Sequence, residues 1–314
     1  MSERNVIERG DGPISAGRIA DDCSQLGVEP GDTLLVHSSL SALGWVAGGA
    51  AAVVDALMET VTDAGTLVMP THTGHYSDPD RWEDPPVPDD WTADVRATIP
   101  PFRPEVTPTR GMGAIPECFR TYPGVVRSRH PTTSFAAWGA DAGFVVGDHA
   151  YDDGLGERSP LARVYDLDGS VLLLGVGHDT NTSLHLAEHR ADFEKTVVTQ
   201  GAPVLASDRR EEGREEGREE ERREGRDEER GEGDARTDRD RRATGAPVAP
   251  DEREWISFEE LDYDDGDFER AGAAFERDRP DATARGRVGN AEAVVLSQRA
   301  LVDYAVGWFG ENRA

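Results

Sequence analysis

The sequence is poor in cysteine and lacks long apolar runs, and both shortages exclude classes of protein. No window approaches the ~18–20 consecutive apolar residues that a membrane-spanning helix requires. The first residues, MSERNVIERG, are charged where a signal peptide has an apolar segment. Cys23 and Cys118 are the two cysteines, and their separation rules out a CxxC metal or redox motif and disfavours a disulfide framework. We therefore expect a cytoplasmic protein that does not enter a membrane.

Lysine is also scarce, and the charge balance is strongly acidic. Lys195 is the one lysine among 34 basic residues, which stand against 62 acidic residues and leave a net charge of −28. Acid-rich, lysine-poor sequences resemble the proteins of salt-loving archaea, whose surfaces stay hydrated in concentrated salt. A negative cleft that attracts a cationic substrate is the functional alternative, but the acidic residues are spread along the whole chain. Nucleic acid is not an expected partner for a chain of this charge.

Apolar runs and helical spacing alternate along the first part of the chain. Residues 33–36 and 66–70 are predicted strands, and apolar residues at four-residue spacing over 53–61 predict a helix between them that Gly65 ends. This order indicates two parallel strands joined by a helical crossover. The 314 residues suffice for one large α/β domain or two small ones, and we predict a central, mostly parallel sheet flanked by helices.

The remaining periodic segments extend this pattern. Residues 170–177 give the strongest strand signal, and the helix expected after them has Asn181 and Thr182 as candidate N-terminal caps. Further helices are predicted over 14–26, 113–122 and 290–309.

Two segments show no sustained period. Residues 76–108 are rich in Pro, Asp and Trp and are predicted to form a long loop. Residues 208–242 contain 16 acidic residues and 12 arginines, a composition that cannot bury a core, so disorder is predicted, with a frayed charged helix as the alternative. The expected organisation is a core over 1–205, an insert over 206–245 and the end of the same domain over 246–314.

Four stretches occur in an informative order: HSSLSALGWVAGG, GTLVMPTHT, TRGMGAIPECFRTYPGVVRSRHPTTSFAAWG and SPLARVYDLDGSVLLLGVGHDTNTSLHLAEHRA. With the ending GRVGNAEAVVLSQRALVDYAVGWF, they resemble the aminoglycoside N(3)-acetyltransferase family over nearly the whole chain from about Ile14, the acidic insert excepted. The resemblance implies acetyl transfer from acetyl-CoA to the 3-amino group of a 2-deoxystreptamine antibiotic, without a metal. It also implies a fold distinct from the GNAT acetyltransferases, because RGMGAI is only a fragment of their RxxGxG loop.

The resemblance leaves two points open. The family includes homologues with other amine substrates or with none established, so a non-catalytic acyl-CoA-binding homologue remains an alternative. The sequence allows either a monomer or a homodimer.

His185 and Glu188 are the predicted catalytic residues. An amine attacks a thioester only as the free base, and an imidazole, with an ordinary pKa of ~6.5, can take its proton at neutral pH. Glu188 at i+3 shares the helix face of His185 and can stabilise the charged ring. The resemblance also implies this role, because the family carries its catalytic histidine in the TxLHxAE pattern. The alternative is a histidine bonded to backbone at a helix start, beside a solvated glutamate.

The same letters allow a metal site. His185, Glu188 and His189 spell HxxEH, the helix motif of inverted zinc peptidases, with Glu259 or Glu260 available as a third ligand. Nothing else in the chain resembles such a peptidase, and short motifs recur by chance. A metallopeptidase is therefore the weaker alternative.

The cofactor-binding residues are predicted at strand ends and a helix start. The stretch HSSLS follows a predicted strand, where α/β proteins bind ligands, and a serine esterase is disfavoured because the GxSxG elbow is missing. The loop before residue 114 offers an arginine and exposed N–H groups to a phosphate. The family resemblance assigns these positions to CoA, the alternative being ordinary capping and turn residues. The predicted set is Ser38, Ser39, Leu40, Thr71, Thr73, Arg110, Met112 and Gly113.

Substrate recognition requires carboxylates in a concave surface, because ammonium groups offer only hydrogen-bond donors. For each acid a solvated surface position is the alternative. The wider pool includes the run FEELDYDDGDF, residues 258–268, with Glu259 and Asp267. The predicted substrate-binding residues are Asp78, Asp152, Glu157, His178 and Asp179.

Overall fold

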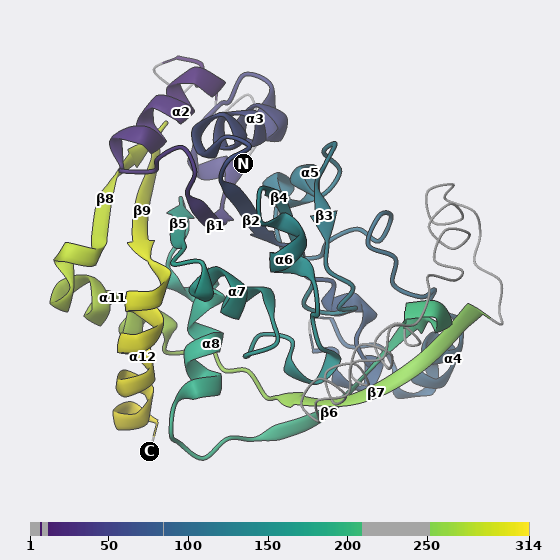
Figure 1. Ribbon diagram of the computed structural model, residues 1–314. Coiled ribbons are helices and arrows are strands. Elements are labelled where there is room, and N and C mark those ends of the chain that lie inside the picture. The colour runs from purple at the N-terminus through teal and green to yellow at the C-terminus, as the bar shows by residue number, and fades with distance from the viewer. Residues whose placement is uncertain (1–6, 8–11, 84, 209–251, 314) are drawn as a thin grey trace, which may run out of the picture.

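A mixed sheet of seven strands forms the centre of the molecule (Figure 1). The computed structural model describes residues 7, 12–83, 85–208 and 252–313. The strand order is β3-β4-β2-β1-β5-β9-β8, parallel over β2-β1-β5 and antiparallel on both flanks. The strands are β1 Thr33–Ser38, β2 Thr66–Pro70, β3 Val126–Arg127, β4 Phe135–Gly139, β5 Ser170–Leu174, β8 Thr283–Val288 and β9 Ala291–Ser297. The predicted α/β fold with a parallel centre is confirmed.

Helices cover both faces of this sheet and bury two apolar cores (Figure 1). Side chains of a strand alternate between faces, so Leu34 and Val36 of β1 enter one core and Leu35 the other. The first face is covered by α2 Ala16–Gln25, α3 Gly49–Val61 and α5 Ala114–Phe119. The second is covered by α6 Ala142–Val146, α7 Pro160–Asp166, α8 Ser183–Arg190, α11 Phe268–Asp278 and α12 Gln298–Asn312.

A long two-stranded arm is the feature that the sequence did not predict. Strands β6 Val197–Leu205 and β7 Arg253–Leu261 pair antiparallel and extend away from the main sheet (Figure 1). Their inner faces pack around Ala202, Val204, Ile256 and Phe258. The predicted insert, 206–245, lies outside the described residues apart from its first three positions.

The predicted loop over 76–108 is partly ordered into helix. It contains α4 Thr92–Thr98, which lies beside the far end of the arm. The backbone carbonyl of Ile99 accepts a hydrogen bond from Nε of Arg253, at 2.9 Å, and so ties the segment to β7. Short 3₁₀ turns complete the connections: η1 Leu40–Ala42, η2 Gly74–Tyr76, η3 Pro79–Arg81, η4 Asp89–Trp91, η5 Tyr151–Asp153, η6 His178–Thr180 and η8 Pro280–Ala282.

The helix predicted over 290–309 was wrong in its first half. Residues Ala291–Ser297 form β9, and only Gln298–Asn312 forms α12. The apolar run at 293–296 is buried without interruption, as in a strand covered on both faces, and it pairs with β5 and β8. Ser297 then caps α12, its Oγ accepting from the N–H of Ala300 at 3.3 Å.

The crossover helix α3 ends differently from the prediction. Its last residue is Val61, and Thr62 rather than a glycine takes the positive φ after it, of 59°. Gly65 serves another purpose, because a Cβ there would lie 2.5 Å from the carbonyl oxygen of Asp32. The glycine thus allows the chain to enter β2 close to β1.

Candidate active site

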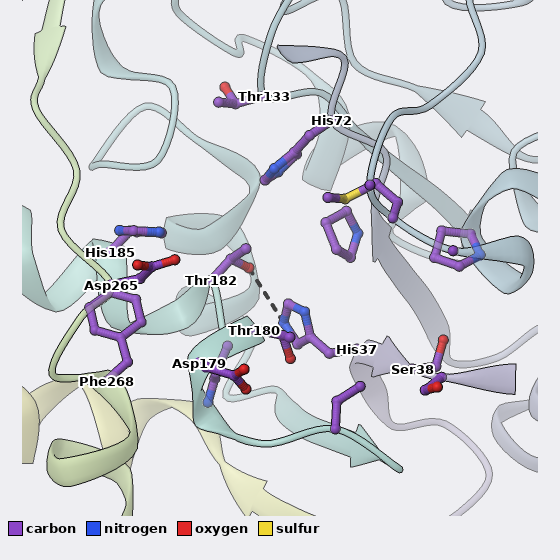
Figure 2. A pocket seen from close by; sticks show the side chains of 18 of the residues that line it. His37, Ser38, His72, Thr133, Asp179, Thr180, Thr182, His185, Asp265 and Phe268 are labelled. Carbon is purple, nitrogen blue, oxygen red and sulfur yellow. Dashed lines mark hydrogen bonds between the residues drawn. The ribbon is translucent and has the colours of Figure 1, made fainter. Parts of the chain in front are cut away.

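A cavity of 710 Å³ opens where β1, β2 and β5 end (Figure 2). Its wall is built from the segments that leave those strands, notably 37–41 and 179–182, and from the loop 111–114 before α5. Ligand sites of α/β proteins form at this edge, because the carboxyl ends of parallel strands meet there.

None of the helices within the described ranges is long and apolar enough to cross a membrane.

The His185–Glu188 pair reaches this cavity from α8. Nδ1 of His185 and Oε2 of Glu188 form a hydrogen bond, as their i, i+3 spacing allows. The ring packs against Tyr263 and Phe268, with centroids 4.8 and 4.7 Å away, and its side chain is 13% exposed. With the proton on Nδ1 donated to Glu188, Nε2 is left as the basic nitrogen. His185 lines the cavity and Glu188 lies behind it.

The start of α8 is fixed by two residues that the sequence suggested as caps. Thr182 occupies the N-cap position, but the capping bond comes from Oδ1 of Asn181, which accepts from the N–H of Ser183 at 3.2 Å. The Thr182 hydroxyl instead lies 3.4 Å from Nε2 of His37 (Figure 2). The turn that presents His185 is thereby linked to the end of β1.

Two further histidines in the cavity wall are held neutral. Burial lowers the pKa of His37 to about 3, helped by His178 and His185. Burial likewise lowers the pKa of His72 to about 3, with His185 and His37 contributing. At neutral pH these rings therefore add polar atoms but no charge to the cavity.

Most of the predicted cofactor residues gather on one side of the cavity. Ser38, Ser39, Leu40, Met112 and Gly113 all line it. The buried Oγ of Ser38 has no hydrogen-bond partner within the part of the chain that is described. A buried hydroxyl without a partner is costly, so this atom is suited to receive a bond from a ligand.

The other three predicted cofactor residues lie outside the cavity wall. Thr71 and Thr73 are fully buried, and their hydroxyls donate to the carbonyls of Ser134, at 3.1 Å, and Pro131, at 2.6 Å. The backbone N–H of Arg110 donates to the carbonyl of His72 at 2.9 Å. These bonds tie the exit of β2 to the segments around it, which differs from the direct cofactor contact that we expected.

Of the predicted substrate residues, Asp179 lines the cavity and the other four do not. His178 is buried behind it against Glu276. The three acids form ion pairs with arginines outside the cavity wall: Asp78 with Arg96, Asp152 with Arg158 and Glu157 with Arg190. These partners could not be recognised in the sequence. From the wider pool, Glu259 is exposed on β7 and Asp267 binds Arg313.

The side chains of the HxxEH motif, His185, Glu188 and His189, do not converge on one point. Nδ1 of His189 lies 3.3 Å from Oδ1 of Asp153, and its Nε2 lies 3.3 Å from the hydroxyl of Tyr263. Glu188 is turned towards His185 and Arg313. No group of three or more potential metal ligands occurs among the residues with described positions.

Several residues of the cavity wall were missed from the sequence. His37 and His72 each stand at the end of a predicted strand, and that position was a usable signal for both. Tyr263 and Asp265 come from the segment between β7 and α11, and Phe268 is the first residue of α11. The acidic composition of the run 258–268 indicated it as a candidate for substrate binding, but only the tertiary fold shows which of its residues reach α8.

Comparisons with known proteins place this cavity in context. The sequence pattern of the family described as "Aminoglycoside 3-N-acetyltransferase" matches residues 35–310. The chain is 36% identical over 310 residues to the aminoglycoside N(3')-acetyltransferase-like protein YokD of Bacillus subtilis, covering 98% of this chain and 97% of that protein. The YokD crystal structure superposes with a TM-score of 0.81, covering 98% of both chains.

The names of two similar solved structures include a bound ligand. AAC-IIIb binary with CoASH is 26% identical with a TM-score of 0.74, covering 96% of this chain and 98% of that one. AAC-VIa bound to sisomicin is 29% identical with a TM-score of 0.72, covering 96% of this chain and 100% of that one. By its sequence and its fold, the chain belongs to the aminoglycoside 3-N-acetyltransferase family.

Proposed function

We propose that this protein transfers acetyl from acetyl-CoA to the 3-amino group of a 2-deoxystreptamine aminoglycoside or a related amine. The observation that carries the proposal is the placement of His185, backed by Glu188, on the same cavity as Ser38 and Gly113. The family membership of the chain supports the transfer reaction. The related structures with CoASH and with sisomicin support acetyl-CoA as the donor and an aminoglycoside as the acceptor.

The proposed chemistry is a direct transfer. The substrate ammonium loses one proton to water, and the resulting free amine attacks the thioester carbonyl carbon while Nε2 of His185 takes a second N–H proton, so that a C–N bond forms and the C–S bond breaks. The proton taken by His185 passes to the departing thiolate, which leaves as free CoA. Glu188 steadies the imidazolium in between, as the carboxylate of a catalytic triad does. Backbone N–H groups near Ser38–Leu40 or Gly113 are the proposed donors to the developing oxyanion.

The residues at the exit of β1 are suited to acetyl-CoA. The unpartnered Oγ of Ser38 offers a hydrogen bond, and the nearby Gly113 has a φ of 84°, a backbone conformation that favours glycine. The aminoglycoside ammonium groups are assigned to the other side, where Asp179 and Asp265 line the cavity near His185 (Figure 2).

The setting of the reaction is part of the proposal. The net charge of −28 with one lysine favours a protein that works in concentrated salt, as in a salt-loving archaeon, and in the cytoplasm. We propose no metal requirement, a monomer or homodimer, and one domain interrupted by an insert at 206–245.

A thiol-release assay tests the function. Wild-type protein in high salt is mixed with acetyl-CoA and a panel of aminoglycosides and simple polyamines, and CoA thiol is followed with time. Release that depends on the amine supports the proposal, as does its loss in His185→Gln with acetyl-CoA binding intact. Binding of acetyl-CoA with no amine-dependent release would instead identify a non-catalytic acyl-CoA-binding homologue.

A further inference from the structure

A charged cluster lies behind the catalytic pair. Arg313, which follows α12, donates through Nη1 to Oε1 of Glu188. Its Nε donates to Oδ2 of Asp267 at 3.0 Å, and its Nη2 donates to the carbonyl of Asp264 at 2.6 Å. All three guanidinium nitrogens therefore have partners, and each partner lies beside the cavity wall formed by Asp265 and Phe268.

This cluster is withdrawn from solvent. The side chains of Glu188, Arg313 and Asp267 are 1%, 10% and 16% exposed. The guanidinium carbon of Arg313 also lies 4.2 Å from the ring centroid of Phe309, which fixes the plane of its fork. A carboxylate buried as deeply as Glu188 requires a cation in hydrogen-bonding contact, and Arg313 meets this requirement.

The electrostatics of Arg313 agree with that role. Burial tends to lower the pKa of its guanidinium, but the hydrogen bonds with Asp267 and Glu188 outweigh burial and raise it. Arg313 therefore stays charged. Without it, the buried carboxylate of Glu188 would lie near that of Asp267 with no cation between them, and like charges repel.

We propose that Arg313 is a positioning residue for the acetyl transfer. It holds Glu188 as an oriented carboxylate, and Glu188 in turn keeps Nδ1 of His185 engaged and Nε2 directed to the cavity. This inference rests on the proposed function for its kinetic test, and it concerns a residue that contacts neither substrate in the arrangement described above.

Three single variants test the proposal by kinetics. Arg313→Gln is expected to lower kcat about 10- to 100-fold, the range for residues that orient a functional histidine, with KM for acetyl-CoA unchanged. Arg313→Lys keeps the charge but loses the fork, so kcat should recover in part. Arg270→Gln is the matched control, because Arg270 stacks on Trp308 at 5.2 Å, also beside α12, and should keep the wild-type kcat. Wild-type kcat in Arg313→Gln would overturn the proposal.

A double-mutant cycle separates positioning from general stabilisation. If Arg313 acts through Glu188, then Glu188→Gln together with Arg313→Gln should have the same kcat as Glu188→Gln alone. Losses that multiply would show that Arg313 acts independently and would contradict the proposal. Melting temperatures of all variants establish that each is folded at the assay temperature.

A spectroscopic readout makes the test independent of turnover. The Nδ1 proton of His185, bonded to Glu188, should give a far-downfield proton NMR signal that is assigned by its loss in His185→Gln. This signal should persist in Arg270→Gln and be lost or displaced in Arg313→Gln. Persistence in Arg313→Gln would refute the positioning role, whereas a wild type that releases no thiol with any amine would refute the proposed function alone.

Discussion

Nε2 of His178 lies 3.0 Å from Oε1 of Glu276, so the described chain holds a second buried histidine–glutamate pair besides His185 and Glu188. Nδ1 of His178 is also engaged, 3.3 Å from Nδ2 of Asn181. His178 thus uses both ring nitrogens inside the protein, whereas His185 presents its ring to the cavity. The free nitrogen distinguishes the proposed base from a structural histidine.

His178→Gln should therefore leave kcat close to wild type while lowering stability. The variant disturbs two buried hydrogen bonds, for which about 1–3 kcal/mol in the free energy of unfolding is expected. Urea unfolding and thiol-release kinetics check the two parts. A folded variant with a loss of kcat as large as that of His185→Gln would assign His178 to the chemistry.

Ser38→Ala should weaken acetyl-CoA binding without weakening the fold. The Oγ of Ser38 is buried without a partner, so its removal costs the free protein nothing, while a hydrogen bond to the ligand is lost. One bond of about 0.5–1.5 kcal/mol corresponds to roughly a 2- to 12-fold rise in Kd, measurable by calorimetry. Ser134→Ala is the contrast, because its Oγ donates to the carbonyl of Thr71 at 2.9 Å and its loss should lower the melting temperature. An unchanged Kd in Ser38→Ala would remove Ser38 from the proposed CoA site.

Stability should fall as the pH is lowered from about 6.5 to about 5. Burial lowers the pKa of His37 to about 3 and that of His130 to about 4, and it lowers the pKa of His149 well below its usual value. The unfolded chain binds these protons near pH 6.5 and the folded protein does not. Each such histidine therefore reduces the free energy of unfolding by about 1.4 kcal/mol per pH unit below that point.

One carboxyl works in the opposite direction. Burial raises the pKa of Glu260 to about 7, so between about pH 4.5 and 7 the folded protein holds a proton there that the unfolded chain releases. Acidification through that window adds stability from Glu260, but His37, His130 and His149, together with His72, outnumber it. Urea unfolding at several pH values and constant salt measures the sum. Stability that is flat or rising between pH 6.5 and 5 would contradict these protonation states.

Chelators should leave the reaction unaffected. His189 is bonded to Asp153 and Tyr263, and Glu188 to His185 and Arg313, so the HxxEH residues are occupied with one another and with their neighbours. Protein purified without a histidine tag should contain no stoichiometric zinc and should keep its kcat in EDTA. Activity that EDTA removes and zinc restores would revive the peptidase hypothesis.

Local sequence determined the centre of the fold well. Strand β2 has the predicted bounds, β1 extends two residues beyond its prediction, and the crossover between them is helical as expected. These elements have an unambiguous period and short connections. The segment at 291–297 failed because an uninterrupted apolar run fits a buried strand and a buried helix equally, and its pairing with β5 decided the outcome.

The site residues also divide into those indicated by local sequence and those determined only by the tertiary fold. The positions of His185 and the serines after β1 on the cavity, and the contact of Glu188 with His185, could be anticipated because these motifs lie within single turns of chain. Arg313 could not, because it stands 125 residues from Glu188 and no local pattern distinguishes it from the other arginines. Asp78, Asp152 and Glu157 lie outside the cavity wall for the related reason that their arginine partners, such as Arg96 for Asp78, could not be recognised in the sequence.

The β6–β7 arm has a consequence for how this enzyme can change in size. Leu205 and Arg253 are paired in register, so the hairpin already holds the two ends of the intervening sequence together. Loop-closure entropy grows slowly with length, by only about 0.6 kcal/mol for each doubling. We therefore expect changes of length within 209–251 to alter the free energy of unfolding little, which makes this part of the chain a suitable place for grafting a reporter.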